Sequence, residues 1–232
     1  MIDHLIASLQ GLDAAQIIKY ITDNYGNRAV FSTSFGIEDQ VLTQLIAQAG
    51  GKIDVFTLET GRLFAETYYV WNRTLERYNI PIKAYYPQAT LVEQMVTKKG
   101  PSSFYDSVEN RKECCFIRKI EPLKRAIQGY EIWITGIRAD QSTNREDMDF
   151  IEWDETNQII KIHPLFEWNL KDVEAHLKQF NIPYNPLHDK GFPSIGCQPC
   201  TRAVAPGEDF RSGRWWWEDK SKKECGLHVS SK

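Results

Sequence analysis

The sequence predicts an α/β fold, in which a mostly parallel sheet carries helices on both faces. Three observations indicate this fold. Apolar β-like runs alternate with segments of helical periodicity over the first 145 residues. Polar segments follow the strand candidates. The length of 232 residues suits one compact domain better than two small ones. Strands that alternate with helices are typical of parallel sheets, whose ligands bind at the carboxyl ends of the strands.

The predicted elements follow in chain order. Apolar residues at Ile17, Ile18 and Ile21 have helical spacing and predict a first helix. Asn169 is a suitable N-cap for the last helix. Beyond residue 183, proline, glycine and charged residues predict loops. The predicted helices cover residues 13–25, 39–48, 64–78 and 170–180, and the predicted strands cover residues 29–34, 53–58, 80–86, 131–135 and 159–162.

Composition narrows the class of protein. Hydrophobic residues make up 42% and charged residues 25%, as in ordinary globular proteins. We expect residues 1–219 to form one domain and residues 220–232 a mobile, charged C-terminal tail. The net charge of -3 argues against a nucleic-acid partner. No signal-peptide pattern or long apolar run is found, so we expect a cytoplasmic protein that binds no membrane. Homo-oligomerisation is left open.

Four of the five cysteines form two close pairs. Cys114 and Cys115 are adjacent, and Cys197 and Cys200 form a Cys-x-x-Cys unit, which directs two thiolates toward one centre. In a reducing compartment such cysteines are ligands or reactive thiols more often than disulfides. Their spacing predicts a four-thiolate metal site and leaves zinc and an iron–sulfur cluster open. A redox dithiol and a simple core position are the alternatives.

Cys225 stands apart from both pairs, with His228 three residues later and three lysines shortly before it. These neighbours favour a thiolate, so Cys225 is a candidate nucleophile. The alternative is an incidental thiol in a frayed tail. Lys119 follows Cys115 by four residues, which in a helix places both on one face. There the ammonium group would offset thiolate charge, and the alternative is a solvated lysine.

Two polar loops are candidates for binding an anion. The segment 32–39 joins a strand to a helix, where hydroxyl groups and free N–H groups can hold phosphate or sulfate. Helix capping by Ser32 or Ser34 is the alternative. The segment 136–145 offers arginines for bidentate contact with an oxyanion. The basic residues of this predicted nucleotide site are Arg138, Arg145, Arg211 and Arg214.

Over roughly residues 25–230 the chain resembles the assimilatory sulfonucleotide reductases, within the adenine-nucleotide α-hydrolase-like superfamily. Its first loop reads Ser-Phe-Gly-Ile-Glu-Asp and lacks the Ser-Gly-Gly-x-Asp-Ser pattern of ATP pyrophosphatases, which argues against their chemistry. The other motifs that carry the resemblance are Glu59-Thr60-Gly61-Arg62, Cys114-Cys115-x-x-Arg118-Lys119, the 136–145 arginine loop, the Cys197/Cys200 pair, Arg211 with Arg214, and Glu224-Cys225-Gly226-Leu227-His228.

The resemblance implies an activity and a cofactor. Family members with the paired cysteines reduce adenosine-5′-phosphosulfate (APS) to sulfite and AMP and bind a [4Fe–4S] cluster. The resemblance therefore implies four cluster ligands, Cys114, Cys115, Cys197 and Cys200. It also implies a Cys225 S-sulfonate that thioredoxin or a similar dithiol protein releases. A reductase of 3′-phosphoadenosine-5′-phosphosulfate (PAPS) or of both nucleotides remains an alternative, as does a non-catalytic, zinc-bound module that senses nucleotides.

The resemblance also implies the residues around the substrate. Lys119 would lie between the cluster and the substrate, and His228 would grip the phosphosulfate and assist the nucleophile. The expected substrate-binding residues are Ser32, Ser34, Phe35, Gly36, Glu59, Thr60, Gly61, Arg62, Arg138, Arg145, Arg211 and Arg214.

Overall fold

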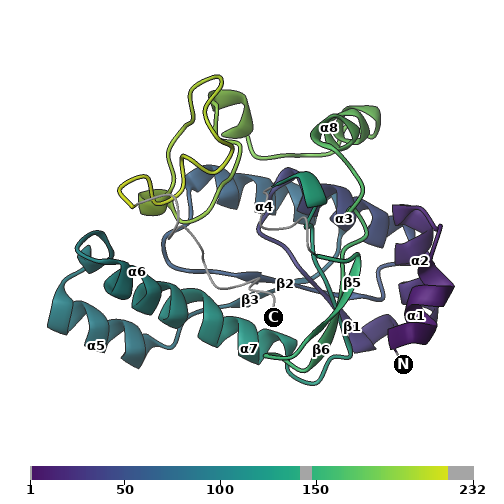
Figure 1. Ribbon diagram of the computed structural model, residues 1–232, viewed down its shortest axis with the longest axis horizontal. Coiled ribbons are helices and arrows are strands. Elements are labelled where there is room, and N and C mark those ends of the chain that lie inside the picture. The colour runs from purple at the N-terminus through teal and green to yellow at the C-terminus, as the bar shows by residue number, and fades with distance from the viewer. Residues whose placement is uncertain (1, 142–147, 219–232) are drawn as a thin grey trace.

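A six-stranded sheet forms the centre of the computed structural model, which describes residues 2–141 and 148–218. The strand order is β3-β2-β1-β4-β6-β5 (Figure 1). All neighbouring strands pair in parallel except β5, which is antiparallel to β6. The predicted mostly parallel sheet is therefore confirmed. The strands are β1 (Ala29–Ser32), β2 (Asp54–Leu58), β3 (Ile82–Tyr85), β4 (Ile132–Ile134), β5 (Ile151–Asp154) and β6 (Ile159–Ile162).

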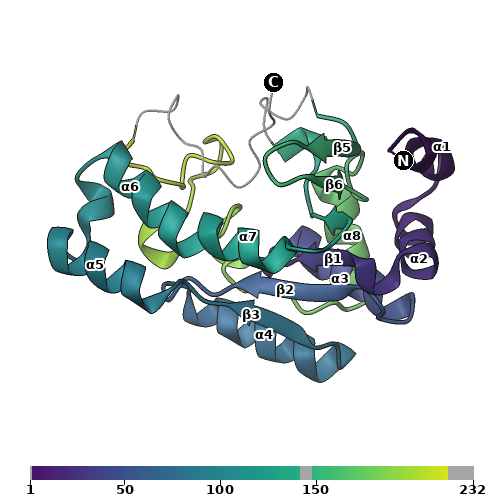
Figure 2. The ribbon, with the colours of Figure 1, turned by 90° about the horizontal axis from the view of Figure 1, so that it is seen from below.

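Helices cover both faces of the sheet. Helices α3 and α4 lie on one face and α7 lies on the other (Figures 1 and 2). The helices are α1 (Ile2–Leu9), α2 (Ala14–Asn24), α3 (Ile37–Gln48), α4 (Ala65–Tyr78), α5 (Ala89–Lys99), α6 (Val108–Cys115), α7 (Glu121–Ile127) and α8 (Leu170–Gln179). A π-helical segment, η3 (Phe116–Ile120), joins α6 to α7. Short 3₁₀ turns are η1 (Gly26–Arg28), η2 (Ser103–Tyr105), η4 (Ala139–Gln141), η6 (His188–Lys190) and η7 (Gln198–Cys200).

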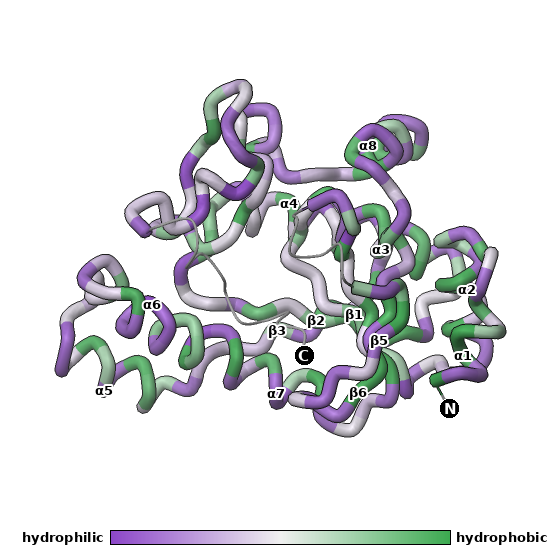
Figure 3. Tube along the Cα trace, in the orientation of Figure 1, coloured by the Kyte–Doolittle hydropathy of each residue, from purple (hydrophilic) through white to green (hydrophobic). Residues whose placement is uncertain are grey.

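Alternation along the strands builds two cores, because successive side chains of a strand point to opposite faces. Val30 packs with Phe56 and Trp133 against α7. Its neighbour Phe31 packs into the larger core beneath α2, α3 and α8. Figure 3 shows hydrophobic residues concentrated where these helices meet the sheet. None of the helices within the described ranges is long and apolar enough to cross a bilayer.

All the predicted strands and helices are found, with boundaries that differ by at most two residues. The capping of α8 by Asn169, whose side chain accepts a hydrogen bond from the Asp172 N–H, is confirmed. Five elements were not predicted: α1, α5, α6, α7 and β5. Helix α6 has no apolar stripe, because the residues it buries are Arg111, Cys114 and Cys115. Hydrophobic periodicity therefore gives no signal there.

The strand order creates a switch point between β1 and β4. From β1 the chain builds outward through β2 to β3, and from β4 it builds in the opposite direction. At such a point the loops after the two central strands diverge and leave a crevice at the carboxyl edge of the sheet. The segments 32–39 and 136–145 begin at this crevice, as the two candidate anion-binding loops require.

A buried group of charged residues stabilises the β5–β6 edge. The Lys161 ammonium group lies 2.8 Å from Asp154 and 3.4 Å from Glu152, and 5.3 Å from the centre of the Trp133 ring. Burial alone would raise the pKa of Asp154, but its hydrogen bonds with Lys161 and Asn157 lower it. The carboxylate therefore depends on its cationic partner.

Replacing Lys161 by Met should lower the free energy of unfolding by about 3–5 kcal/mol, because Asp154 would stay buried without its partner. Urea unfolding followed by circular dichroism measures this loss. Lys19→Met is a suitable control, since Lys19 pairs with Asp23 on the surface, and it should cost less than about 1 kcal/mol. Equal losses in the two variants would contradict the interpretation.

Candidate active site

A cavity of about 450 Å³ opens at the switch point, between the loops that follow β1 and β4. One part of its wall is apolar and includes Leu58, Leu123 and Trp133. Another part is basic. The predicted site residues that line the cavity are Ser32, Ser34, Phe35, Gly36, Thr60, Lys119, Cys197, Arg211 and Arg214. The fold therefore gathers residues from six separate segments around one space large enough for a nucleotide.

The loop after β1 presents its backbone to this cavity. Gly36 is the N-cap of α3 and makes no side-chain capping hydrogen bond. Ser32 instead accepts a hydrogen bond of 2.9 Å from the Trp133 indole N–H. Capping by Ser32 or Ser34 is therefore wrong. Phe35 has a left-handed backbone, with φ of 61°, and its ring stacks on Trp71 at 5.3 Å. This stacking stabilises a conformation that is costly for a bulky residue.

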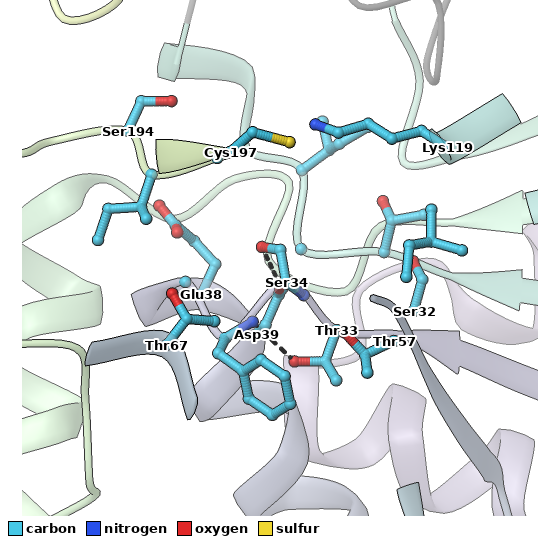
Figure 4. Close-up of a pocket in the computed structure, with 18 of the residues that line it drawn as sticks. Ser32, Thr33, Ser34, Glu38, Asp39, Thr57, Thr67, Lys119, Ser194 and Cys197 are labelled. Carbon is cyan, nitrogen blue, oxygen red and sulfur yellow. Dashed lines mark hydrogen bonds between the residues drawn. The ribbon is translucent and has the colours of Figure 1, made fainter. Parts of the chain in front are cut away.

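Asp39 connects the two loops behind the cavity. Its Oδ2 atom accepts hydrogen bonds from the Ser34 N–H at 2.6 Å and the Ser34 hydroxyl group at 2.7 Å (Figure 4). A Cβ atom added to Gly136 would lie 2.4 Å from Asp39 Oδ1, so only glycine fits there. Burial raises the pKa of Asp39 to about 6, against the opposing effect of the Ser34 hydrogen bonds.

The four paired cysteines line a second, smaller cavity that adjoins the first. All four are buried. The Cys197 thiol donates a hydrogen bond of 3.4 Å to Thr60. Burial raises the pKa of the Cys114 thiol and raises that of Cys200 to about 12. Within the described ranges, no three His, Cys, Asp or Glu side chains converge closely enough to hold a single metal ion. The thiols thus enclose a space rather than one point.

Positive charge surrounds these thiols. No Asp or Glu is among the described residues that line the cysteine cavity. The Arg118 guanidinium, itself buried, donates a hydrogen bond of 2.6 Å to the Thr60 carbonyl group. The basic side chains around the cavity are Arg62, Arg111, Arg118, Lys119 and Arg214. Such a shell stabilises an anionic group, and it opposes the rise in thiol pKa that burial causes.

Lys119 is shared by both cavities. In Figure 4 its ammonium group and the Cys197 thiol point toward one another above Ser34. The π-helical segment η3 carries Lys119, whereas Cys115 ends α6, yet both side chains reach the cysteine cavity. The expectation that Cys115 and Lys119 face the same site is confirmed, although one continuous α-helix does not carry them.

Comparison with known proteins identifies the family. The model of the phosphoadenosine phosphosulfate reductase domain matches residues 28–203. The chain is 49% identical to adenosine 5′-phosphosulfate reductase of Agrobacterium fabrum over 97% of this chain and 86% of that protein. It is 46% identical to the enzyme of the same name from Burkholderia cepacia, over 98% and 90% of the two chains. The chain belongs to the phosphoadenosine phosphosulfate reductase family.

Solved structures agree with this membership. The phosphoadenylyl-sulfate reductase of Candida auris, a phosphate complex, superposes with a TM-score of 0.74 at 28% identity and covers 88% of this chain and 96% of that one. Yeast FAD synthetase shares only the fold, with a TM-score of 0.56 and 18% identity over 86% of this chain and 68% of its own. The sulfonucleotide reductase resemblance is thereby confirmed.

Four of the residues that we expect to bind substrate are not among the described residues of the main cavity wall. They are Glu59, Gly61, Arg62 and Arg138. Glu59 accepts hydrogen bonds from the Gly61 N–H at 2.9 Å and the Tyr68 hydroxyl group at 2.8 Å. Arg138 forms ion pairs with Glu38, at 3.0 Å, and with Asp140. In the structure these side chains shape the loops, and direct substrate contact stays a prediction for them.

Three further predicted residues, Arg145, Cys225 and His228, lie outside the described residues. Sequence reasoning also missed several residues of the cavity wall, and Asp39 and His188 are two of them. Asp39 ends the Ser-Phe-Gly-Ile-Glu-Asp motif, and its position in that motif was the available signal. His188 lines the cavity from η6, and burial lowers its pKa. No pattern in the sequence around His188 indicates its place at the site.

Asp39→Asn should change how stability depends on pH. The folded protein keeps the Asp39 proton up to a pH of about 6, whereas the unfolded chain loses it at its ordinary pKa of 3.8. The stabilisation by that proton is fully present below pH 3.8 and is lost as the pH rises through about 6. Between pH 5 and pH 8, the free energy of unfolding of the variant should therefore rise by about 1.4 kcal/mol relative to that of the wild type. Parallel urea-unfolding results at the two pH values would contradict this.

Proposed function

We propose that this protein reduces adenosine-5′-phosphosulfate to sulfite and AMP in assimilatory sulfate reduction. The observation that carries the proposal is the shared wall of the two cavities. Lys119, Cys197, Arg214 and Trp215 line both the nucleotide-sized cavity and the cysteine cavity. A basic boundary of this kind suits a phosphosulfate on one side and thiolate-bound iron on the other. The names of the curated relatives support the same activity.

The adenosine would occupy the apolar part of the main cavity, near Leu58 and Trp133, and the phosphosulfate would lie toward Lys119, Arg211 and Arg214. The open amino end of α3 adds backbone N–H groups. These groups would bind the substrate anion and stabilise the negative charge that develops on the phosphate when its bond to sulfur breaks.

The Cys225 thiolate would attack the sulfur of the substrate. A sulfur–sulfur bond forms, the bond between that sulfur and the phosphate oxygen breaks, and AMP leaves with the electron pair. The product is a Cys225 S-sulfonate. A dithiol protein, thioredoxin or a relative, then attacks the Cys225 sulfur and releases sulfite. Its second thiol resolves the mixed disulfide, so the dithiol supplies both electrons. His228 would assist from the same tail.

Domain organisation fits this scheme. We infer that residues 1–219 act as one nucleotide-binding domain, and that residues 220–232 form the tail that brings Cys225 to the substrate and then to the dithiol protein. Nucleophiles on terminal segments can alternate between such positions.

Four cysteines would hold a [4Fe–4S] cluster: Cys114, Cys115, Cys197 and Cys200. The donor set fits, because four buried thiols enclose a space and basic side chains surround them. A cluster with four thiolates is anionic and would add a fixed negative charge beside Lys119. A single zinc ion is the poorer match, because Cys114 and Cys115 are adjacent and the side chains of successive residues point in different directions.

The second candidate is a reductase of PAPS or of both nucleotides. The family model and the Candida auris structure carry the name of that activity. The 3′-phosphate of PAPS requires its own basic contact, and competitive turnover of the two nucleotides distinguishes the candidates. A zinc-bound module that senses nucleotides, the third candidate, would be colourless and would require no reactive Cys225.

Incubating the purified protein with APS, without a dithiol protein, should add one sulfonate group to Cys225. Intact-mass measurement should detect it, and reduced thioredoxin should remove it. Cys225→Ser should form no adduct and keep the iron content of the wild type. An adduct on the Ser variant would show that Cys225 is not the nucleophile. No adduct on wild-type protein with full iron content would mean that APS is not the substrate or that Cys225 is not the nucleophile, and PAPS would then be tested.

Lys119→Ala should lower kcat/KM by about 100-fold or more, because the positive charge nearest to the departing phosphate is lost. Melting temperature and iron content should stay close to those of the wild type. Lys124→Ala is the matched control, since Lys124 lies exposed on the adjoining helix α7, and its turnover should be unchanged. Unaltered turnover of Lys119→Ala would show that Lys119 does not stabilise the charge that develops in the reaction.

A further inference from the structure

A buried ion pair lies two residues before the tail, at Glu218. Arg111, on α6, and Glu218 have side chains only 1% and 3% exposed. The Arg111 Nε atom donates a hydrogen bond to Glu218 Oε1 at 2.9 Å, and Nη2 donates one to Oε2 at 2.8 Å. Two parallel hydrogen bonds of this kind fix orientation as well as distance. We call the Arg111–Glu218 pair the clasp.

Through Arg111, the clasp connects helix α6 and its Cys115 thiol to the segment that leads into the tail. Burial alone would lower the pKa of Arg111, but its hydrogen bonds with Glu218 and the Cys115 thiol raise it. Its guanidinium also lies 4.7 Å from the centre of the Trp215 ring. Arg111 therefore contacts one predicted cluster ligand and the segment that leads into the tail at the same time.

The segment before the tail is also held to the second cysteine pair. The Trp215 N–H donates a hydrogen bond of 3.2 Å to the Cys200 carbonyl group, and the Arg214 guanidinium lies 4.8 Å from the Trp215 ring. Trp215 is 1% exposed and has a left-handed backbone, with φ of 42°. A residue of this bulk keeps such a conformation only where its surroundings enforce it. The segment from Arg214 to Glu218 is thus fixed to both cysteine-bearing segments.

Anchoring at Glu218 shortens the free length of chain that carries the nucleophile. Glu218 precedes Cys225 by seven residues, so an anchored chain carries Cys225 within about 25 Å of the clasp. Without the clasp, the preceding backbone attachment to another segment is the hydrogen bond from Trp215 to Cys200, from which the reach is about 36 Å. The effective concentration of a tethered group falls with tether length and with loss of a defined starting direction.

We propose that Arg111 and Glu218 are positioning residues that set the rate at which the Cys225 thiolate attacks the substrate. This inference rests on the proposed function. Stability alone is a weak reason for such a pair, because the cost of removing two charges from water cancels most of their attraction. Neither residue is among those that line the nucleotide cavity. Loss of the clasp therefore affects the step that forms the S-sulfonate, and not the binding of the nucleotide.

The experiment uses the holoprotein with Glu218→Gln, which keeps the size of the side chain and removes its charge. Single-turnover formation of the Cys225 S-sulfonate at saturating APS is followed by quenched intact mass. The rate should fall by more than about twofold, because the longer tether alone lowers the effective concentration of the thiolate by nearly that factor and the lost starting direction lowers it further. Iron content, AMP affinity and the rate of Cys225 alkylation by iodoacetamide should stay within about twofold, because alkylation requires no docking of the tail.

Asp154→Asn is the matched control. It weakens an equally buried ion pair, with Lys161, at the edge of the sheet, and it should lower stability without slowing S-sulfonate formation. Wild-type protein that forms no adduct would refute the proposed function. An adduct that forms equally fast in wild type and Glu218→Gln would overturn the clasp alone.

If Glu218→Gln loses iron, Glu218→Asp keeps the charge and shortens the side chain by one methylene group. A slower S-sulfonate step with full iron content in that variant supports the proposal, and an unchanged rate overturns it. Loss of iron from both variants would make the pair a structural support of the cysteine site, which also overturns the positioning role.

Discussion

Four buried thiols and a shell of basic side chains line one small cavity, and this arrangement is the constraint on which the rest of the site depends. The two cysteine pairs come from α6 and from η7, which are far apart in the sequence. Burying several cations in one place is costly unless an anionic group compensates for them. Burial raises the pKa of two of these thiols, Cys114 and Cys200, so they require a cationic environment to ionise. The thiolates and the basic side chains therefore stabilise each other.

This constraint explains the arrangement of the neighbouring cavity. Lys119 and Arg214 belong to the walls of both cavities, so the charge that balances the thiols also faces the nucleotide site. Arg118 ties the cysteine cavity to the Thr60 carbonyl group, and Thr60 accepts the Cys197 hydrogen bond. The loop after β2 is therefore shared between the nucleotide-sized cavity and the cysteine cavity.

A second set of contacts holds the loops of the nucleotide site. Asp39 accepts both donors of Ser34 and lies against Gly136, so the loops that follow β1 and β4 support each other. The parallel pairing of β1 with β4 brings these loops together at the switch point. The stack of Phe35 on Trp71 from α4 supports the same turn from the opposite side. Binding groups on such mutually supported loops are pre-organised, which lowers the cost of ordering them around a ligand.

The sequence by itself determined the fold class, the order of the main strands and helices, and the residue types of the chemistry. Hydrophobic periodicity and the cysteine and arginine motifs are local signals, which a single segment can carry. Only the tertiary structure decided which arginines face a cavity, that Arg138 pairs with Glu38, and that Arg111 meets Glu218. Charged side chains of identical type differ in role through partners that are distant in the chain. Strand order and helix packing determine those partners, and a local sequence pattern carries no information about either.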